Sequence, residues 1–140
     1  MQANPCAIID SGDYDDIDVK ELTAKILELI NIGVTDFWFT DTSGYFEMSC
    51  IKIIGMLKKA HPDIKRILIA VTNKNLEKAY LKYDEVFLPG YKSLNIQARI
   101  AERRRYIVKA AAYGLCYVDC LRDKVRIFEY AYLRSEKTAS

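Results

Sequence analysis

Short apolar runs alternate with longer amphipathic stretches along nearly the whole chain, and this alternation restricts the fold more than any other feature. An uninterrupted apolar run of four to six residues is typical of a strand that is buried on both faces, as happens in parallel sheets. Parallel strands need long crossover connections, which are usually helices. The pattern therefore predicts an α/β fold in which helices cover a mostly parallel sheet.

The order of these segments predicts a specific architecture. The predicted strands are residues 6–9, 35–39, 66–71, 85–88 and 114–118. The predicted helices are residues 19–30, 45–60 and 95–112, with a short helix within 72–83. This order is typical of a Rossmann-like three-layer α/β/α sandwich with a five-stranded, mostly parallel sheet, whose strands end along one ligand-binding edge.

The ends of the first helix carry their own signals. Asp18 directly precedes the helix, and Glu21 lies three residues after Asp18 in its first turn. This spacing resembles a capping arrangement. Gly33 is expected to end the same helix.

The segment 123–134 fits two structures. Its residues Val125, Phe128 and Tyr132 have helical spacing, which favours a helix. Its β-branched and aromatic content would also suit a strand.

Length and composition indicate one globular domain over residues 1–140, because 51% of the residues are hydrophobic. No apolar run approaches the roughly 18 to 20 residues of a membrane span, and the first residues lack the pattern of a signal peptide. We therefore expect a cytoplasmic protein without membrane contact. A net charge of +2 does not by itself indicate a nucleic-acid binder.

Four cysteines fall mostly inside apolar stretches, where a cysteine behaves as a small hydrophobic residue: Cys6, Cys50, Cys116 and Cys120. No Cys-x-x-Cys pair is present, so we expect free thiols and no bound metal. A zinc site built from Cys116, Cys120 and His61 is the alternative.

Three phrases carry a resemblance to a known family: "GVTDFWFTDTSGYFEMSCIKIIGMLKKAHPDIKRILIAV", "YDEVFLPG" and "ERRRYIVKAAAYGLCYV". With the order of elements, they resemble the Rossmann-like proteins of the SLOG superfamily, particularly its small YpsA-like branch. The superfamily also includes the LOG-type phosphoribohydrolases and the DprA-like binders of single-stranded DNA. The resemblance implies a nucleotide-related ligand at the carboxyl edge of the sheet.

The family's ligand motifs are only partly present. Gly44, Phe46 and Glu47 match the loop that follows the second strand, although that loop commonly carries more glycines in the family. Arg103 matches an arginine before the fifth strand, while Arg104 stands where asparagine is usual. The Ser-Asp-Tyr phrase is replaced by Ala111, Ala112 and Tyr113, the glycine-rich turn after the fifth strand by "DCLRDK", and the phosphoribohydrolase signature Pro-Gly-Gly-x-Gly-Thr is absent.

These departures replace glycines and acids with bulkier, apolar or basic residues, so we expect catalysis to be lost. Binding need not be lost, since a helix N-terminus and one arginine together still hold an anion. We therefore expect no catalytic residue and no cofactor. The expected ligand-binding residues are Ser11, Gly12, Asp41, Thr42, Ser43, Gly44, Glu47, Arg103 and Arg104.

Glu47 and Arg103 each have a structural interpretation beside the functional one. Glu47 is either a third helical residue that reaches back to cap the backbone, or a partner for a sugar hydroxyl or base. Arg103 lies in the apolar stripe of its helix, so its guanidinium either meets a carboxylate at the rim or points at a ligand. We expect the loop at 41–47 and Arg103 to form one anion site.

The sequence thus favours a non-catalytic or weakly active binding module for a nucleotide-derived small molecule, acting as a sensor or a sequestering protein. The alternatives are a structural or interaction protein with a vestigial site, and a nucleotide-processing hydrolase or nucleic-acid binder. The ten tyrosines favour a homo-oligomer, because aromatic side chains are enriched at protein contacts.

Overall fold

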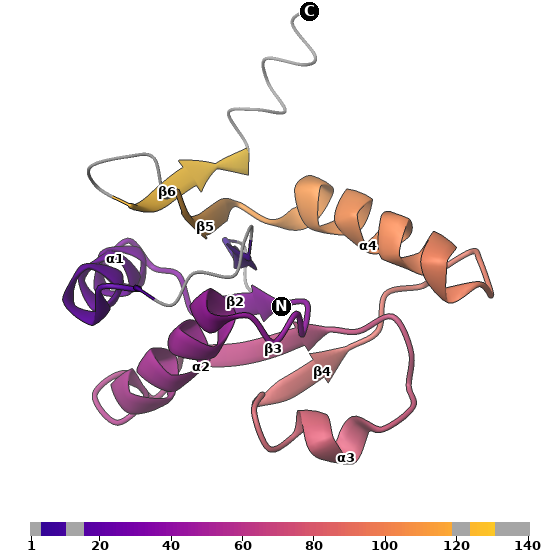
Figure 1. The fold of residues 1–140 in the computed structure, drawn as a ribbon, viewed down its shortest axis with the longest axis horizontal. Helices are drawn as coiled ribbons and strands as arrows, with labels where there is room; N and C mark the ends of the chain where they lie inside the picture. Colours follow the sequence, from indigo (N-terminus) through magenta and orange to yellow (C-terminus); the bar gives the residue numbers. More distant parts are fainter. Residues whose placement is uncertain (1–3, 11–15, 119–123, 131–140) are drawn as a thin grey trace, which may run out of the picture.

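The computed structural model describes residues 4–10, 16–118 and 124–130 and has a Rossmann-like α/β fold (Figure 1). Its sheet has six strands in the order β4-β3-β2-β1-β5-β6. The strands are β1 (Cys6–Ile9), β2 (Asp36–Phe39), β3 (Lys65–Ile69), β4 (Glu85–Phe87), β5 (Tyr113–Tyr117) and β6 (Val125–Glu129). The first five are parallel, as expected, and β6 is antiparallel to β5.

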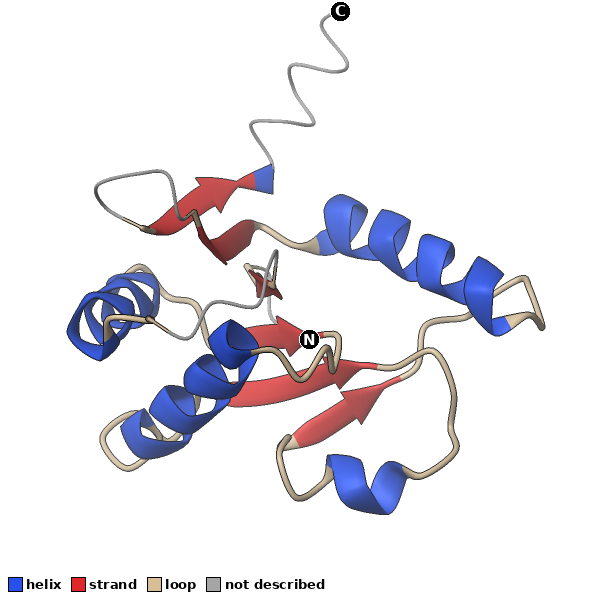
Figure 2. Cartoon of the chain, in the orientation of Figure 1, coloured by secondary structure: helices blue, strands red, loops and turns tan. Residues whose placement is uncertain are grey.

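In the described ranges four helices accompany the sheet (Figure 2): α1 (Val19–Asn31), α2 (Tyr45–Leu57), α3 (Leu76–Ala79) and α4 (Ile96–Ala110). One apolar cluster joins α1 and α2 to the sheet through residues such as Leu22 and Ile54. A second cluster joins α4 to the sheet through Ile107, which packs with Trp38 and Ile67. The sheet is therefore the middle of three layers. No helix in the described part of the chain is long and apolar enough to cross a membrane.

Strand β2 shows why the sequence folds in this way. All four of its residues are buried, with Phe37 and Phe39 in the cluster under α1 and α2 and Trp38 in the cluster under α4. Side chains of a strand alternate between faces, so an uninterrupted apolar run requires cover on both sides.

The expected ends of α1 are confirmed. The Asp18 carboxylate accepts hydrogen bonds from the backbone N–H groups of Lys20 and Glu21. At the other end, Gly33 has a φ of +100°, a left-handed conformation that glycine adopts without steric cost.

The preference for a helix in the segment 123–134 is wrong over Val125–Glu129, which forms the sixth strand. Val125 is fully buried, and its N–H donates to the Glu21 carboxylate at 2.8 Å. The Phe128 ring covers Gly114 of β5 so closely that a Cβ there would lie 2.1 Å from it. Pairing with β5 thus outweighs the helical spacing, and residues 131–134 lie outside the described part of the chain.

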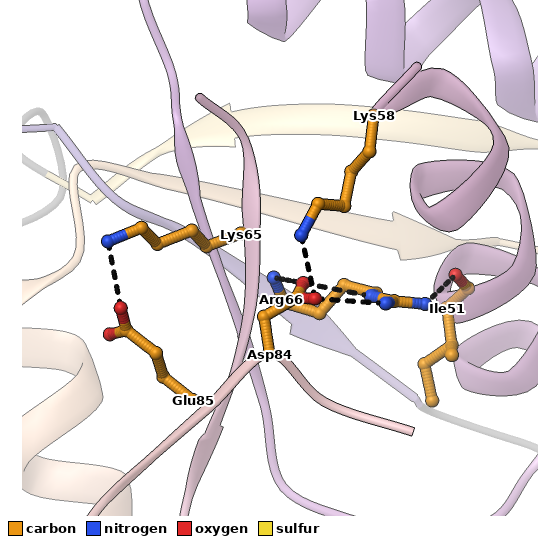
Figure 3. Close-up of polar contacts among 6 residues, drawn as sticks. All are labelled: Ile51, Lys58, Lys65, Arg66, Asp84 and Glu85. Atoms are coloured by element: carbon orange, nitrogen blue, oxygen red, sulfur yellow. Dashed lines mark hydrogen bonds and ion pairs between the residues drawn. The ribbon is translucent and has the colours of Figure 1, made fainter. Parts of the chain in front are cut away.

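An ion network fixes the start of β4 against α2 (Figure 3). The Arg66 guanidinium donates to both oxygens of Asp84, from Nε at 3.0 Å and from Nη2 at 3.0 Å. The backbone N–H of Arg66 donates to Asp84 Oδ2 at 2.8 Å, and Lys58 at the end of α2 adds a contact to Oδ1 at 2.7 Å. Arg66 also donates to the backbone oxygen of Ile51 in α2 at 3.3 Å. The network therefore joins β3, β4 and α2.

Replacing Ile54 with Ala should lower the free energy of unfolding by about 2 to 5 kcal/mol, because the fully buried side chain would leave a cavity between α2 and the sheet. Met56→Ala on the same helix is the matched control, since Met56 is 64% exposed. Denaturant unfolding of both variants tests this, and equal losses would contradict the packing of α2.

The pKa of Asp84 lies well below its usual range: burial alone would raise it, but the hydrogen bonds from Arg66 and Lys58 outweigh that effect. A carboxylate with a lowered folded-state pKa stabilises the protein above its unfolded pKa of about 4, and this stabilisation is lost as the pH falls further. Asp84→Asn should therefore lower Tm at neutral pH, and the Tm difference from wild type should shrink towards about pH 2 to 3. Glu77→Gln, at an exposed position on α3, is the control and should change Tm little at either pH. A difference for Asp84→Asn that is constant across the pH range would contradict the network.

Candidate functional site

A cavity of about 640 Å³ opens at the carboxyl edge of the sheet, beyond the ends of β2 and β3. Segments from four places line it: the loop after β2, the loop after β3, α3 with the residues that follow it, and α4. This edge is where open α/β sheets bind ligands. We call this cavity the carboxyl-edge pocket.

The pocket has apolar walls and an excess of positive charge. Its largest apolar side chains are Leu68, Val71, Leu76, Leu81 and Ile100. Its charged side chains are Lys74, Lys78, Lys82, Arg103 and one acid, Asp41. Four cations against one carboxylate favour an anionic ligand with an apolar part.

Arg103 reaches the pocket from α4. Its Nη1 donates to the backbone oxygen of Ile69 at the end of β3, at 3.1 Å. Burial lowers the pKa of the guanidinium, and the nearby charges of Tyr91, Glu47 and Asp41 partly oppose that effect. The guanidinium head thus meets a backbone carbonyl, and no carboxylate lies within ion-pair distance of it among the described residues.

Glu47 anchors a hydrogen-bond network beside the pocket. Its side chain is 1% exposed, and its Oε2 accepts from the Thr42 N–H at 3.0 Å and the Thr42 hydroxyl at 2.6 Å. Its Oε1 accepts from the Tyr83 hydroxyl at 2.9 Å, and the same hydroxyl lies 3.0 Å from Asp41. Burial and these two carboxylates raise the pKa of Tyr83 far above its usual range. The network connects the loop after β2 to the segment before β4.

Gly44 is the residue directly before α2, and the Asp10 side chain lies against it. A Cβ at position 44 would fall 2.1 Å from Asp10 Oδ2, so only glycine fits without a shift of Asp10. Asp10 Oδ2 also lies 3.0 Å from the Thr42 hydroxyl, whose single proton is shared between Asp10 and Glu47. A carboxylate of the protein itself therefore lies at the α2 N-terminus, where glycine-rich loops commonly hold a phosphate.

The backbone at this edge adopts unusual conformations. Within the described residues, the non-glycine residues with positive φ are Asp41, Ser43 and Asn75, at 59°, 62° and 60°. Two of them, Asp41 and Asn75, line the carboxyl-edge pocket. Left-handed backbone is unfavourable for side-chain-bearing residues and is often found at ligand sites.

The residues expected from the sequence fall into three groups. Asp41 and Arg103 line the same pocket, whereas Thr42, Gly44 and Glu47 belong to the neighbouring network. Ser43 and Arg104 are exposed and outside the pocket lining. Ser11 and Gly12 lie outside the described residues.

The two interpretations of Glu47 and Arg103 can be compared with this geometry. Gly44 is the N-cap of α2 and Glu47 its third residue, as expected, but Glu47 bonds Thr42, two positions before the cap. The structural interpretation therefore describes its observed contacts, and a ligand contact to Glu47 stays a prediction. The head of Arg103 meets the Ile69 carbonyl instead of a carboxylate, and a ligand contact to Arg103 also stays a prediction.

Sequence reasoning missed several residues of this region. Asp10 and Tyr83 were not expected to take part, and Lys74, Lys78 and Lys82 were treated only as part of a polar segment. Only Lys78 lies within α3, and Lys74 and Lys82 flank that helix, so the four-residue spacing of the three lysines is the one signal that could have grouped them.

The described cysteines are free, and burial raises the pKa of the thiols of Cys6, Cys50 and Cys116. Within residues 4–10, 16–118 and 124–130, no group of three His, Cys, Asp or Glu side chains could hold a metal ion. The alternative zinc site includes Cys120, which lies outside the described residues.

No protein-family model matches the sequence, and no curated protein matches it significantly. The resemblance to the SLOG superfamily therefore rests on the quoted residues and stays a prediction.

Gly44→Ala should lower the free energy of unfolding by about 1 to 3 kcal/mol, because the new methyl group would displace Asp10 from Thr42. The loss should be smaller when the same change is made in an Asp10→Ala background, where the space is free. A double-mutant cycle from denaturant unfolding measures this coupling. Equal losses in both backgrounds would show that Asp10 does not occupy this position.

Proposed function

We propose that this protein is a non-catalytic binding module for a nucleotide-related anionic ligand, which it holds in the carboxyl-edge pocket. The observation that carries the proposal is Arg103, a half-buried cation on α4 that lines the pocket. In the described residues its hydrogen bond goes to a neutral carbonyl, so the charge has no bonded counter-ion. A ligand phosphate or carboxylate would supply one.

The composition of the pocket supports a nucleotide-like ligand over a simple anion. A volume of about 640 Å³ lies within the usual range for small-molecule sites. The apolar walls from Leu76, Leu81 and Ile100 suit a base, and the lysines on the α3 side suit phosphate oxygens. Thr40, Thr72 and Asn75 offer further polar contacts for a sugar.

The state of the acids supports binding without catalysis. A general acid or base must reach the reacting atom of the substrate. Both oxygens of Glu47 accept hydrogen bonds from protein groups, and Asp41 contacts Tyr83 and, at 3.5 Å, Lys82. These carboxylates hold the loop in place, and the proposal assigns none of them to a reaction. The same proposal implies that the protein descends from a SLOG-like ancestor and has lost the catalytic motifs of that superfamily.

The test is a thermal-shift screen with nucleotides and ADP-ribose derivatives, since a ligand that binds only the folded state raises Tm. For a hit, Arg103→Ala should weaken binding by about 1.5 to 3 kcal/mol, the usual contribution of a hydrogen bond to a charged group. Calorimetry would measure this loss.

Arg105→Ala is the matched control, because Arg105 is exposed on α4 and does not line the pocket. It should change affinity little. Equal weakening by both substitutions would show that the ligand responds only to the charge of α4, and a screen without any stabilising compound of this class would count against the proposal.

A further inference from the structure

Strand β6 is an end strand of the sheet, on the side opposite β4 (Figure 1). Backbone groups of a strand point alternately to its two sides. The N–H of Tyr130, directly after β6, donates to the backbone oxygen of Ala112, so the even-numbered residues of β6 face β5. The odd-numbered residues therefore direct their N–H and C=O groups away from the sheet: Val125, Ile127 and Glu129.

One of these three residues already uses its outward N–H group. The N–H of Val125 donates to the Glu21 carboxylate of α1 at 2.8 Å. In the described part of the chain, Ile127 and Glu129 make no hydrogen bond on the outward side. Each of the two residues thus offers one donor and one acceptor to another chain.

The two end strands of the sheet differ in how they limit pairing with another chain. Strand β4 has three residues, and a very short edge strand is a poor template for a further strand. Strand β6 has five residues, which pair with β5 in one uninterrupted register, without a bulge or a proline. Its β-branched and aromatic residues favour an extended conformation: Val125, Ile127 and Phe128. β6 is therefore the end strand that is better suited to accept another strand.

The charged residues of β6 restrict how two copies of this strand can pair. A two-fold axis between two copies makes their β6 strands antiparallel and places one residue directly opposite itself. An axis at Arg126 would oppose two arginines, and an axis at Glu129 would oppose two glutamates. Like charges directly opposite each other are unfavourable in a sheet. These two registers are therefore disfavoured.

The contact between Val125 and α1 restricts the pairing further. An axis at Ile127 would set the C=O of Glu129 against the N–H of Val125, which is already bonded to α1. An axis at Val125 would oppose two such N–H groups. An axis at Phe128 has none of these conflicts, because it sets Ile127 opposite Glu129, and both residues have free backbone groups.

We propose that the protein forms a two-fold symmetric homodimer in which the β6 strands of two copies pair antiparallel, with the axis at Phe128. Ile127 of each copy lies opposite Glu129 of the other, and each such pair exchanges two N–H···O=C bonds. The two Phe128 residues form a non-hydrogen-bonded pair, in which facing Cα atoms are about 4.5 Å apart. Facing aromatic side chains favour such pairing.

The free backbone groups select a second copy as the occupant of this edge. The two residues that lack partners are complementary to each other across the axis, so a second copy satisfies every free group of Ile127 and Glu129 at once. A contact centred on one strand is small, and small interfaces are weak. We therefore expect a dimer that dissociates on dilution. The inference is independent of the carboxyl-edge pocket, because no residue of β6 lines it.

The first experiment is sedimentation velocity from about 10 to 500 µM, where a weak dimer should form and dissociate. Glu129→Pro removes the outward N–H and leaves the pairing with β5 intact, because proline is tolerated in an edge strand where its N–H would face outward. Glu129→Ala is the matched control, since it removes the same side chain and keeps the N–H. The proline variant should dimerise at least about tenfold more weakly than the alanine variant, because each dimer loses two hydrogen bonds.

The second experiment is amide hydrogen exchange of the wild type, followed by NMR at increasing protein concentration. The N–H groups of Ile127 and Glu129 should become protected as the dimer forms, whereas the N–H of Val125 should be protected at every concentration. This measurement tests the contact even if circular dichroism shows that the proline variant is unfolded.

Three outcomes would overturn the proposal. The first is a wild type that stays monomeric across the whole concentration range. The second is a dimer in which the N–H groups of Ile127 and Glu129 exchange as fast as in the monomer, which would place the contact elsewhere. The third is a folded Glu129→Pro variant that dimerises as tightly as Glu129→Ala.

Discussion

The buried carboxyl group of Glu47 holds together the segments that form the carboxyl edge. Burial of a carboxyl group is unfavourable unless hydrogen bonds replace its contacts with water, and here Thr42 and Tyr83 provide them. Through these contacts the loop after β2 is tied to the segment before β4, although β3 and α3 lie between them in the chain. Asp41 shares the Tyr83 hydroxyl and is thereby held at the pocket. The same interaction stabilises the fold and shapes the site.

The two faces of the sheet carry different helices because the order in which strands are added reverses after β4. Within the described residues, the crossovers from β1 to β4 place their helices on one face, and the return from β4 to β5 places α4 on the other. The amino-terminal half of α4 contributes Ile100 and Arg103 to the carboxyl-edge pocket. A single helix therefore carries both the pocket cation Arg103 and exposed cations such as Arg105.

The fold could be predicted from the sequence wherever local pattern and tertiary environment agree. The buried run of β2 and the cap at Asp18 are examples, because each follows from residues that are close in sequence. Strand β6 could not, since its helical spacing is a local signal, while the reasons for its pairing, Gly114 under Phe128 and the Glu21 carboxylate, lie far away in the chain. The residues of the candidate site also divide into those that a local pattern identifies and those that only the fold brings together. Arg103 was identifiable from its place in an apolar stripe, but the contacts of Asp10 and Tyr83 depend on the packing of distant segments.

The position of β1 in the sheet determines when the fold can be completed. This strand is near the start of the described chain, yet it lies between β2 and β5, with Cys6 paired to Phe37 on one side and to Tyr113 on the other. During synthesis on the ribosome, β1 through β4 can associate early, but one side of β1 keeps unpaired backbone groups until β5 has emerged. An incomplete chain therefore exposes an apolar strand edge, the kind of surface that leads to aggregation or chaperone binding. Among the six described strands, β1 is made earliest and is among the last to be fully paired.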